Sequence, residues 1–381
     1  MKIVYIITDL AIGGAQMMLY KLLSKMSRER FTPVVVSLMD NGTVGDRLEA
    51  LGIAVYAIGM KQGKPTPGSI WRLVRLVRQL QPDLIQGWMY HGNLAAQLGS
   101  TFCSKKTPVL WSIHNSIYSL AYEKRMTAAV IKAGAHLSKL PAKIVFVSQI
   151  SQSQHQALGY CREKSCIIPN GFDSSLFIPS SEANLSIRSD LSLPEKSFLI
   201  GLVARFDPLK DHENFLRAAS ILSRNYPDVH FLLVGLGVDR ENQILNQLIQ
   251  ELGLRVQTHL LGERKDMPRI TAALDIACSS SYSEAFPIAI GEAMSCGVPC
   301  VVTDVGDSAI IVGDTGRVIP PRKPDLLANA WKEIIELSLE DRKALGNAAR
   351  NRILDCFSLA SIVVKYEALY ESLLDNKISQ T

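Results

Sequence analysis

The feature that most constrains the fold is an alternation of short apolar segments with longer helical ones, which occurs twice along the chain. In the first half, apolar segments lie at residues 2–8, 32–38, 54–58, 84–88, 109–113 and 144–148, separated by helical patterns such as 16–26 and 69–81. In the second half, they lie at 198–204, 230–235, 256–261, 276–279 and 299–303, separated by helical patterns at 212–225, 239–252, 267–273 and 287–296. Strands that alternate with helices predict parallel sheets covered on both faces.

A polar, turn-rich segment at residues 180–196 separates the two alternations and is the best candidate for a linker. The chain has 381 residues, which exceeds one ordinary core and fits two domains. We therefore predict an α/β protein with two doubly wound, Rossmann-like domains, at residues 1–180 and 181–358. Two such domains facing each other would form a ligand-binding cleft.

The charge and the cysteines exclude several classes of protein. The net charge is +5, from 41 Lys and Arg against 36 Asp and Glu, which does not favour nucleic acid but suits anionic ligands or an acidic membrane surface. The 7 cysteines contain no C-x-x-C pair, so neither a disulfide framework nor a zinc site is expected, and a reducing cytosol is indicated. The apolar start, residues 1–10, is interrupted by Asp9 and fits a buried strand better than a signal peptide.

In open α/β sheets, ligands bind beyond the carboxyl ends of the strands, so the loops that follow strands can hold a site. The first such loop contains Gly13 and Gly14, just before the helical segment 16–26. Glycines let a backbone approach a ligand closely, and the helix N-terminus favours an anion. A simple turn explains the two glycines equally well, so both interpretations stay open.

The loop after the segment 198–204 carries two cations. Arg205 stands at the end of the strand, and Lys210 stands just before a helix for which Asp211 is a suitable N-cap. A planar guanidinium with a compact ammonium suits a diphosphate and can stabilise a leaving group that gains negative charge. Solvated surface charges are the alternative, but the position at the end of a strand favours binding.

The loop at residues 279–285 carries Glu284 and leads into a helix that contains Glu292. Pro287 suits a helix start, and the free amides at 286–288 could hold phosphate oxygens. Carboxylates accept hydrogen bonds from vicinal sugar hydroxyls, so these two could bind opposite ends of one ligand. A surface position near the helix N-terminus is the alternative for Glu292, but the apolar neighbours indicate a largely buried helix, in which a carboxylate needs a partner.

These motifs, in this order, resemble those of the retaining glycosyltransferases of family 4, which have the GT-B fold. The matching residues are Gly13-Gly14-Ala15-Gln16, Pro169-Asn170-Gly171-Phe172-Asp173, Ala204-Arg205 with Lys210, Leu233-Val234-Gly235-Leu236-Gly237, Glu284-Ala285-Phe286-Pro287 and Glu292-Ala293-Met294-Ser295-Cys296-Gly297-Val298-Pro299. The spacing of Glu284 and Glu292, together with the residues 293–299 that follow, is a specific match, whereas the other matches are individually weak. Gln16 stands where the family more often has Glu, and Ala285 where it more often has Gly.

The resemblance implies which residues bind a nucleotide-sugar donor. They are Gly13, Gly14, Arg205, Lys210, Gly235, Arg264, Glu284, Phe286, Pro287, Ile288 and Glu292. Those implied to act in catalysis are His114, Glu284, Arg205 and Lys210. Gly14 would lie under the diphosphate, amides around Phe286 and Ile288 would hold the distal phosphate, and His114 would lie near the donor sugar.

Further roles follow from the same resemblance. Arg205 and Lys210 would bind the diphosphate, and Arg264 would lie beside the base. Glu292 would bind the ribose hydroxyls, and Glu284 would position the transferred sugar rather than act as a nucleophile. No metal ligand is implied, and the chain contains no D-x-D triplet.

The implied activity is retaining, metal-independent transfer of a sugar from a UDP- or GDP-sugar to a glycan, lipid-linked or small-molecule acceptor. No cofactor is implied besides the donor, and residues 359–381 would form a helix that packs back on the first domain. The alternatives are a sugar-nucleotide epimerase or hydrolase on the same fold, and a non-catalytic protein that binds nucleotide sugars. A dinucleotide oxidoreductase is disfavoured, since Gly235-x-Gly237 lacks the third glycine of that fingerprint.

Acceptors in this family meet the amino-terminal domain. The helical segment 69–81 is amphipathic, with Arg72, Arg75 and Arg78 along one side. It either lies on the anionic inner face of a membrane, and so brings a cytoplasmic enzyme to a lipid-linked acceptor, or covers the sheet with a solvated arginine face. His91, which follows a strand, either lines the acceptor side or is structural.

Overall fold

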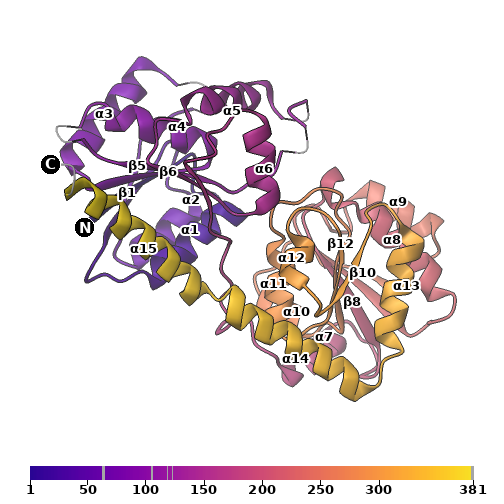
Figure 1. The fold of residues 1–381 in the computed structure, drawn as a ribbon. Coiled ribbons are helices and arrows are strands. Elements are labelled where there is room, and N and C mark those ends of the chain that lie inside the picture. The colour runs from indigo at the N-terminus through magenta and orange to yellow at the C-terminus, as the bar shows by residue number, and fades with distance from the viewer. Residues whose placement is uncertain (62–64, 104–105, 118, 122, 379–381) are drawn as a thin grey trace. The chain divides into compact units, whose positions relative to one another are not determined.

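The computed structural model describes residues 1–61, 65–103, 106–117, 119–121 and 123–378, so 379–381 of the expected C-terminal helix lie outside the described residues. The chain forms two compact units, Met1–Gly171 with Leu359–Thr381, and Phe172–Ser358 (Figure 1). The expected boundary at residue 180 therefore falls inside the second unit. No described helix combines the length and the apolar composition that a bilayer span requires.

The first unit is built on a seven-stranded parallel sheet in the order β3-β2-β1-β4-β5-β6-β7. Its strands are β1 (Lys2–Ile7), β2 (Thr32–Ser37), β3 (Ala54–Ala57), β4 (Leu84–Trp88), β5 (Val109–Ile113), β6 (Lys143–Phe146) and β7 (Ser165–Ile167). Its helices are α1 (Gly14–Lys25), α2 (Gly42–Ala50), α3 (Pro67–Leu80), α4 (Met89–Ser100), α5 (Arg125–Leu137), α6 (Gln149–Ala157) and α15 (Leu359–Ile378).

Strand β1 shows why this sheet is covered on both faces. Successive side chains of a strand point to opposite faces, and here both sets are apolar. Ile3, Tyr5 and Ile7 pack in one core with α1, α2 and α15. Val4 and Ile6 pack in the other core, with α3, α4 and α5. The first unit is therefore doubly wound, as the alternation of elements predicts.

Helix α15 joins the first unit although its sequence lies beyond the second. The Tyr370 hydroxyl donates to the Gln86 side-chain oxygen at 2.6 Å, inside the core. The Glu367 carboxylate accepts a hydrogen bond from the Ser27 amide at 2.8 Å and pairs with Arg30. A buried carboxylate needs such partners, so these contacts fix the helix on the loop between α1 and β2.

The second unit is built on a six-stranded parallel sheet in the order β10-β9-β8-β11-β12-β13. Its strands are β8 (Phe198–Val203), β9 (Val229–Val234), β10 (Thr258–Leu260), β11 (Ile276–Ser279), β12 (Cys300–Thr303) and β13 (Arg317–Ile319). Its helices are α7 (Ser181–Asp190), the 3-10 turn η1 (Pro208–Lys210), α8 (His212–Ser223), α9 (Gln243–Glu251), α10 (Met267–Ala272), α11 (Ile288–Ser295), α12 (Ser308–Val312), α13 (Pro324–Ile335) and α14 (Leu339–Cys356).

Helices also cover both faces of this second sheet. On one face, α8, α9 and α13 share a core in which Phe215 and Trp331 meet with ring centroids 5.0 Å apart. On the other face lie α10 and α11 (Figure 1), and Gly291 of α11 leaves room for the ring of Phe172. Both sheets are thus parallel and enclosed by helices, which confirms the predicted α/β class.

The predicted linker at 180–196 is wrong, because most of it forms helix α7. The Ser180 hydroxyl accepts from the Ala183 amide and caps the helix, and Ile187 is buried. Arg188, also buried, pairs with the Asp275 carboxylate at 2.5 Å. The segment is polar in composition, but Ala183 and Ile187, four residues apart, give the helix a buried side that packs on the unit.

Candidate functional site

Loops that follow three neighbouring strands meet at the carboxyl edge of the second sheet. Strands β8, β11 and β12 are adjacent and parallel, so the loops after them emerge at the same edge. The Tyr282 amide donates to the Leu209 carbonyl at 3.0 Å, which joins the loops after β8 and β11. The Asp307 amide donates to the Ala285 carbonyl at 3.1 Å, which joins the loops after β11 and β12.

Asp207 organises the two cations of the loop after β8. Its carboxylate accepts from the Leu209 amide at 2.9 Å, which caps η1, and pairs with Arg205 Nη2 at 2.9 Å. Although partial burial opposes it, the hydrogen bonds from Leu209 and Arg205 hold the pKa of Asp207 below its ordinary value. The Arg205 side chain stays 63% exposed and that of Lys210 24% exposed, so both remain open to a ligand.

Glu284 and Lys210 come together from loops 74 residues apart in sequence. Lys210 Nζ lies 2.5 Å from Glu284 Oε1, and the Ser281 hydroxyl donates to the same oxygen at 2.7 Å. The Glu284 side chain is only 11% exposed, so the ammonium compensates a carboxylate that is largely removed from water. The pair has the chemistry to receive a ligand that carries phosphate at one end and hydroxyls at the other.

Thr303 supports this loop, and sequence reasoning did not identify it. It stands at the end of β12, and its hydroxyl donates to the Ser281 carbonyl at 2.5 Å and approaches the Ser279 carbonyl at 3.3 Å. The Ser280 hydroxyl donates to the Lys210 carbonyl at 2.9 Å. The available signal in the sequence was the position of Thr303 at the end of an apolar strand segment.

At two positions around these loops, another backbone segment comes so close that only glycine fits. Gly306 has a φ of +59°, and a Cβ there would lie 2.5 Å from the Glu284 carbonyl oxygen. Gly235 has a φ of +152°, and a Cβ there would lie 2.2 Å from the Ala204 carbonyl oxygen, next to Arg205. Packing therefore accounts for Gly235, and its expected contact with a donor stays a prediction.

Helix α11 begins at Ile288, with Pro287 at the N-cap position. The Phe286 side chain is buried and stacks on Phe172, with ring centroids 5.8 Å apart, so it offers a ligand only its backbone. Most residues of α11 are buried, so the helix is largely buried as expected, while Ile288 and Glu292 are half-buried. The free amides at the start of a helix suit an anion, and Glu292 follows on the accessible side.

Arg264, after β10, is held by an acid that sequence reasoning missed. Its Nε and Nη2 each lie 2.8 Å from a different carboxylate oxygen of Asp266. Asp266 also accepts from Arg269 at 3.0 Å, and the pKa of Asp266 is lowered, mainly by the hydrogen bond from Arg264. This fork fixes the guanidinium plane, which can stack beside a base.

Gly13 and Gly14 begin α1 in the first unit. Gly13 is the extended N-cap, and a Cβ on Gly14 would meet no described atom within 4 Å. Nothing in the described fold therefore requires a glycine at 14, which favours the close approach of a ligand. The Gln16 amide donates to the Asp9 carboxylate at 3.0 Å, a bond that a glutamate at 16 would not make.

His114 is also in the first unit, where it is buried and stacks on Trp88 with ring centroids 4.3 Å apart. Burial lowers its pKa to about 3, and the nearby Asn170 side chain opposes this only partly. The ring is therefore neutral near pH 7 and can contact a ligand only as a neutral imidazole.

The structure thus brings together part of the expected donor site within the second unit. Lys210 and Glu284 form one ion pair across two loops. Arg205 and Arg264 each pair instead with an acid of their own loop, Asp207 and Asp266.

Two models of known protein families match the chain, one in each half. Residues 12–176 match the family described as Glycosyltransferase Family 4, and residues 184–352 match Glycosyl transferases group 1. The chain belongs to glycosyltransferase family 4. The resemblance seen in the motifs is therefore confirmed.

Curated relatives of this family 4 protein are named either for lipid-linked acceptors or, as D-inositol 3-phosphate glycosyltransferase, for a small molecule. An Escherichia coli protein, UDP-Gal:alpha-D-GlcNAc-diphosphoundecaprenol alpha-1,3-galactosyltransferase, is 30% identical over 56% of this chain and 56% of its own length. The chain thus spans about half the length of the first curated relatives it matches. A Campylobacter jejuni N,N'-diacetylbacillosaminyl-diphospho-undecaprenol alpha-1,3-N-acetylgalactosaminyltransferase is 24% identical over 87% of this chain and 89% of its own length.

Solved structures of other proteins show the same fold. Anabaena HepE in complex with UDP has a TM-score of 0.85 and 25% identity over 98% of this chain and 100% of its own. WaaG, a glycosyltransferase involved in lipopolysaccharide biosynthesis, has a TM-score of 0.74 and 18% identity over 97% of this chain and 99% of its own. The family 4 chain therefore has the GT-B type of fold, as expected.

Proposed function

We propose that this family 4 protein transfers a sugar from a UDP- or GDP-sugar to a lipid-linked, glycan or small-molecule acceptor, with retention of configuration and without a metal. The observation that carries the proposal is the contact of Lys210 with Glu284, with the exposed Arg205 in the same loop as Lys210. Two cations suit a diphosphate, and a carboxylate suits sugar hydroxyls. The UDP in HepE, at 25% identity, supports this type of donor.

Donor binding would exchange the partners of the ion pair. The diphosphate would take Lys210 and Arg205, and Glu284 would then be free to accept hydrogen bonds from the sugar. The Ser281 hydroxyl, 2.7 Å from Glu284 Oε1, would keep the carboxylate oriented during the exchange. Binding of the phosphate would thereby be coupled to recognition of the sugar.

The transfer itself would need no protein nucleophile. The bond from the anomeric carbon to the diphosphate oxygen breaks, and a bond to the acceptor oxygen forms on the same face. The acceptor proton passes to an oxygen of the leaving diphosphate. Lys210 and Arg205 stabilise the charge that develops on that diphosphate, a role that fixed cations can fill in place of a metal.

The acceptor side would lie in the first unit, in a cytoplasmic enzyme at the inner face of a membrane. On α3, Trp71 is 60% exposed, and the guanidinium of Arg75 lies 5.2 Å from its ring centroid. An exposed tryptophan among arginines suits an anionic lipid surface. The Escherichia coli and Campylobacter jejuni relatives are named for diphospho-undecaprenol acceptors, which supports a lipid-linked acceptor here.

Donor screening tests the proposal. The protein is incubated with UDP-, GDP- and ADP-sugars, with or without EDTA and a crude lipid or glycan acceptor, while nucleotide release is followed. We expect acceptor-dependent release from a UDP- or GDP-sugar that EDTA does not reduce, and a product with the donor's anomeric configuration by NMR. Lys210→Gln should lower the rate about 100-fold, whereas Lys343→Gln, at an exposed position of α14, should not change it.

Other outcomes would identify the competing functions. Release at the same rate without acceptor would indicate a hydrolase, and formation of an epimeric sugar would indicate an epimerase. Donor binding without any release would indicate a binding protein.

A further inference from the structure

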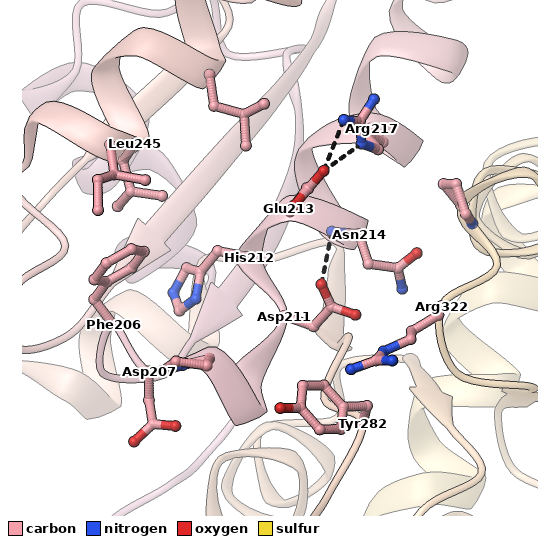
Figure 2. Close-up of a pocket in the computed structure, with 14 residues that line it drawn as sticks. Phe206, Asp207, Asp211, His212, Glu213, Asn214, Arg217, Leu245, Tyr282 and Arg322 are labelled. Carbon is pink, nitrogen blue, oxygen red and sulfur yellow. Dashed lines mark hydrogen bonds and ion pairs between the residues drawn. The ribbon is translucent and has the colours of Figure 1, made fainter.

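A pocket lies in the second unit, on the side of the β8 loop that faces α8 and α9. Its volume is about 520 Å³, within the range of about 300–1,000 Å³ typical of small-ligand sites. Figure 2 shows an apolar side, with Phe206 and Leu245, and a polar side, with Asp211, Asn214 and Arg322. Lys210 and Glu284 are not among the residues that line it.

Asn214, in the first turn of α8, is the residue that points to a ligand. Its side chain lines the pocket, although the residue is only 4% exposed. Neither its amide oxygen nor its amide nitrogen has a hydrogen-bond partner among the described residues. A buried amide without hydrogen-bond partners is unfavourable, so an occupant that bonds to this amide would be stabilised.

The charged groups that line the pocket are three carboxylates and two guanidiniums, those of Asp207, Asp211, Glu213, Arg217 and Arg322. Burial raises the pKa of Asp211, and the nearby Arg322 opposes that rise, so the two face each other as opposite charges. The Arg322 guanidinium also lies 4.1 Å from the ring centroid of Tyr282. At the rim, Glu213 pairs with Arg217 at 2.7 Å. The pocket therefore has no excess of positive charge for a phosphate.

Two further lining groups, the imidazole of His212 and the amide of Asn214, are neutral and can both donate and accept. Burial lowers the pKa of His212 to about 4, so this lining imidazole is neutral near pH 7. A neutral imidazole offers one donor and one acceptor, and the amide of Asn214 also offers both kinds. Sugar hydroxyls need both kinds of partner, and the carbon faces of a sugar ring fit against an apolar wall such as Phe206 and Leu245.

We propose that this pocket binds a saccharide, as an uncharged polyhydroxyl ligand, at a site separate from Lys210 and Glu284. Its polar wall is continuous with the loops that carry those residues. The Ser280 hydroxyl approaches the Asp211 carbonyl at 3.1 Å, and the Tyr282 amide donates to Leu209 at 3.0 Å. A sugar bound in the pocket would therefore stabilise the loops after β8 and β11 from the side opposite Lys210 and Glu284.

Binding of simple sugars to the full chain tests the proposal. Saturation-transfer difference NMR is recorded with D-glucose, D-galactose and N-acetyl-D-glucosamine, in the presence of saturating UDP and again without UDP. We expect at least one sugar to bind in both conditions, so the outcome does not depend on donor binding or on transfer. Asn214→Leu should weaken that binding about tenfold, the effect of losing hydrogen bonds to one amide. Asn347→Leu, at an exposed position of α14, should bind as the wild type does.

Thermal unfolding separates a ligand-binding amide from a structural one. Because the Asn214 amide has no described partner, the Tm of Asn214→Leu should equal or exceed that of the wild type. A lower Tm would overturn the proposal, because the amide would then stabilise the fold. Undiminished sugar binding by Asn214→Leu, no binding of any of the three sugars, or tighter binding of inorganic phosphate than of sugar would overturn it too.

Discussion

At the residue scale, the Lys210–Glu284 pair should separate binding of the nucleotide from recognition of the sugar. Glu284→Gln removes the carboxylate that lies 2.5 Å from Lys210 Nζ but keeps the shape of the side chain. We expect UDP to bind at least as tightly, because the diphosphate no longer competes with Glu284 for the ammonium. The preference for UDP-sugar over UDP should fall, and kcat should fall about 100- to 1,000-fold. Calorimetric titrations and steady-state rates measure these effects.

Glu333→Gln is the matched control for this variant. Glu333 also pairs with a cation, Arg317, at 2.7 Å, but it lies exposed on α13, away from the site loops. Affinities and rates should stay unchanged in this control. A parallel loss of UDP and UDP-sugar affinity in Glu284→Gln, or a covalent glycosyl-enzyme trapped on Glu284 in the wild type, would contradict the assigned positioning role.

Gly14 gives a second prediction, because the described fold does not explain why a glycine stands there. Gly14→Ala adds a methyl group in open space at the first position of α1, which should stabilise the unit by up to about 1 kcal/mol. If a donor approaches this backbone, the same methyl group should cost about 1–3 kcal/mol of its binding free energy. Thermal unfolding and UDP-sugar titration measure the two effects.

Gly68→Ala serves as the control, since Gly68 also lies in the first turn of a helix, and a Cβ there would likewise meet no described atom within 4 Å. It should gain stability in the same way and keep its donor affinity. Equal donor affinity in Gly14→Ala and the wild type would remove Gly14 from the proposed donor site.

At the element scale, the sequence predicts which segments form strands better than which strands become neighbours. Strands apolar on both faces are recognisable, and Arg205, Lys210 and Glu284 were found because each follows such a segment. The roles of Thr303 and Gly306 were not predicted, because both residues contact the loop after β11 from the end of β12. Those contacts depend on β11 and β12 being neighbours, and the order of strands in the sheet is not visible in the sequence. Helix α7 was not predicted, because only a few apolar residues in a serine-rich segment define its buried side.

Helix α3 carries a prediction of its own about membranes. The substitutions Trp71→Ser, Arg72→Gln, Arg75→Gln and Arg78→Gln alter exposed residues and leave the buried Leu73 and Val77 in place. If this helix contacts anionic lipid, the wild type should float with anionic vesicles and not with neutral ones, and the variant should lose most of that binding. Each arginine near the surface contributes about 1 kcal/mol.

A variant with Arg224→Gln, Arg255→Gln and Lys343→Gln removes the same positive charge from exposed positions of the second unit. It should float as the wild type does. Equal recovery of the wild type with neutral and anionic vesicles would show that the arginines of α3 are only a solvated face.

At the scale of the whole molecule, both units bury histidines that the fold keeps neutral. In the first unit, burial lowers the pKa of His114 to about 3 and that of His155 to about 4. In the second unit, burial lowers the pKa of His212 and of His259 to about 4. The unfolded chain protonates its histidines near pH 6.5, so between about pH 6.5 and about pH 4 it binds more protons than the fold does. Both units should therefore lose stability as the pH falls through this window.

His155→Gln tests this expectation at one buried ring. His155 Nδ1 lies 2.7 Å from the Ser151 carbonyl and Nε2 lies 2.9 Å from the Tyr90 hydroxyl, so the folded ring is held neutral with its proton on Nδ1. Each such histidine steepens the pH dependence of the unfolding free energy by up to about 1.4 kcal/mol per pH unit. The difference in unfolding free energy between wild type and variant should therefore shrink as the pH falls from about 6.5 to about 4.5, in denaturant titrations of the first unit's transition.

His136→Gln, at an exposed position of α5, is the control, and its unfolding free energy should change with pH in parallel with that of the wild type. Parallel curves for His155→Gln would mean that the folded and unfolded chains protonate residue 155 alike.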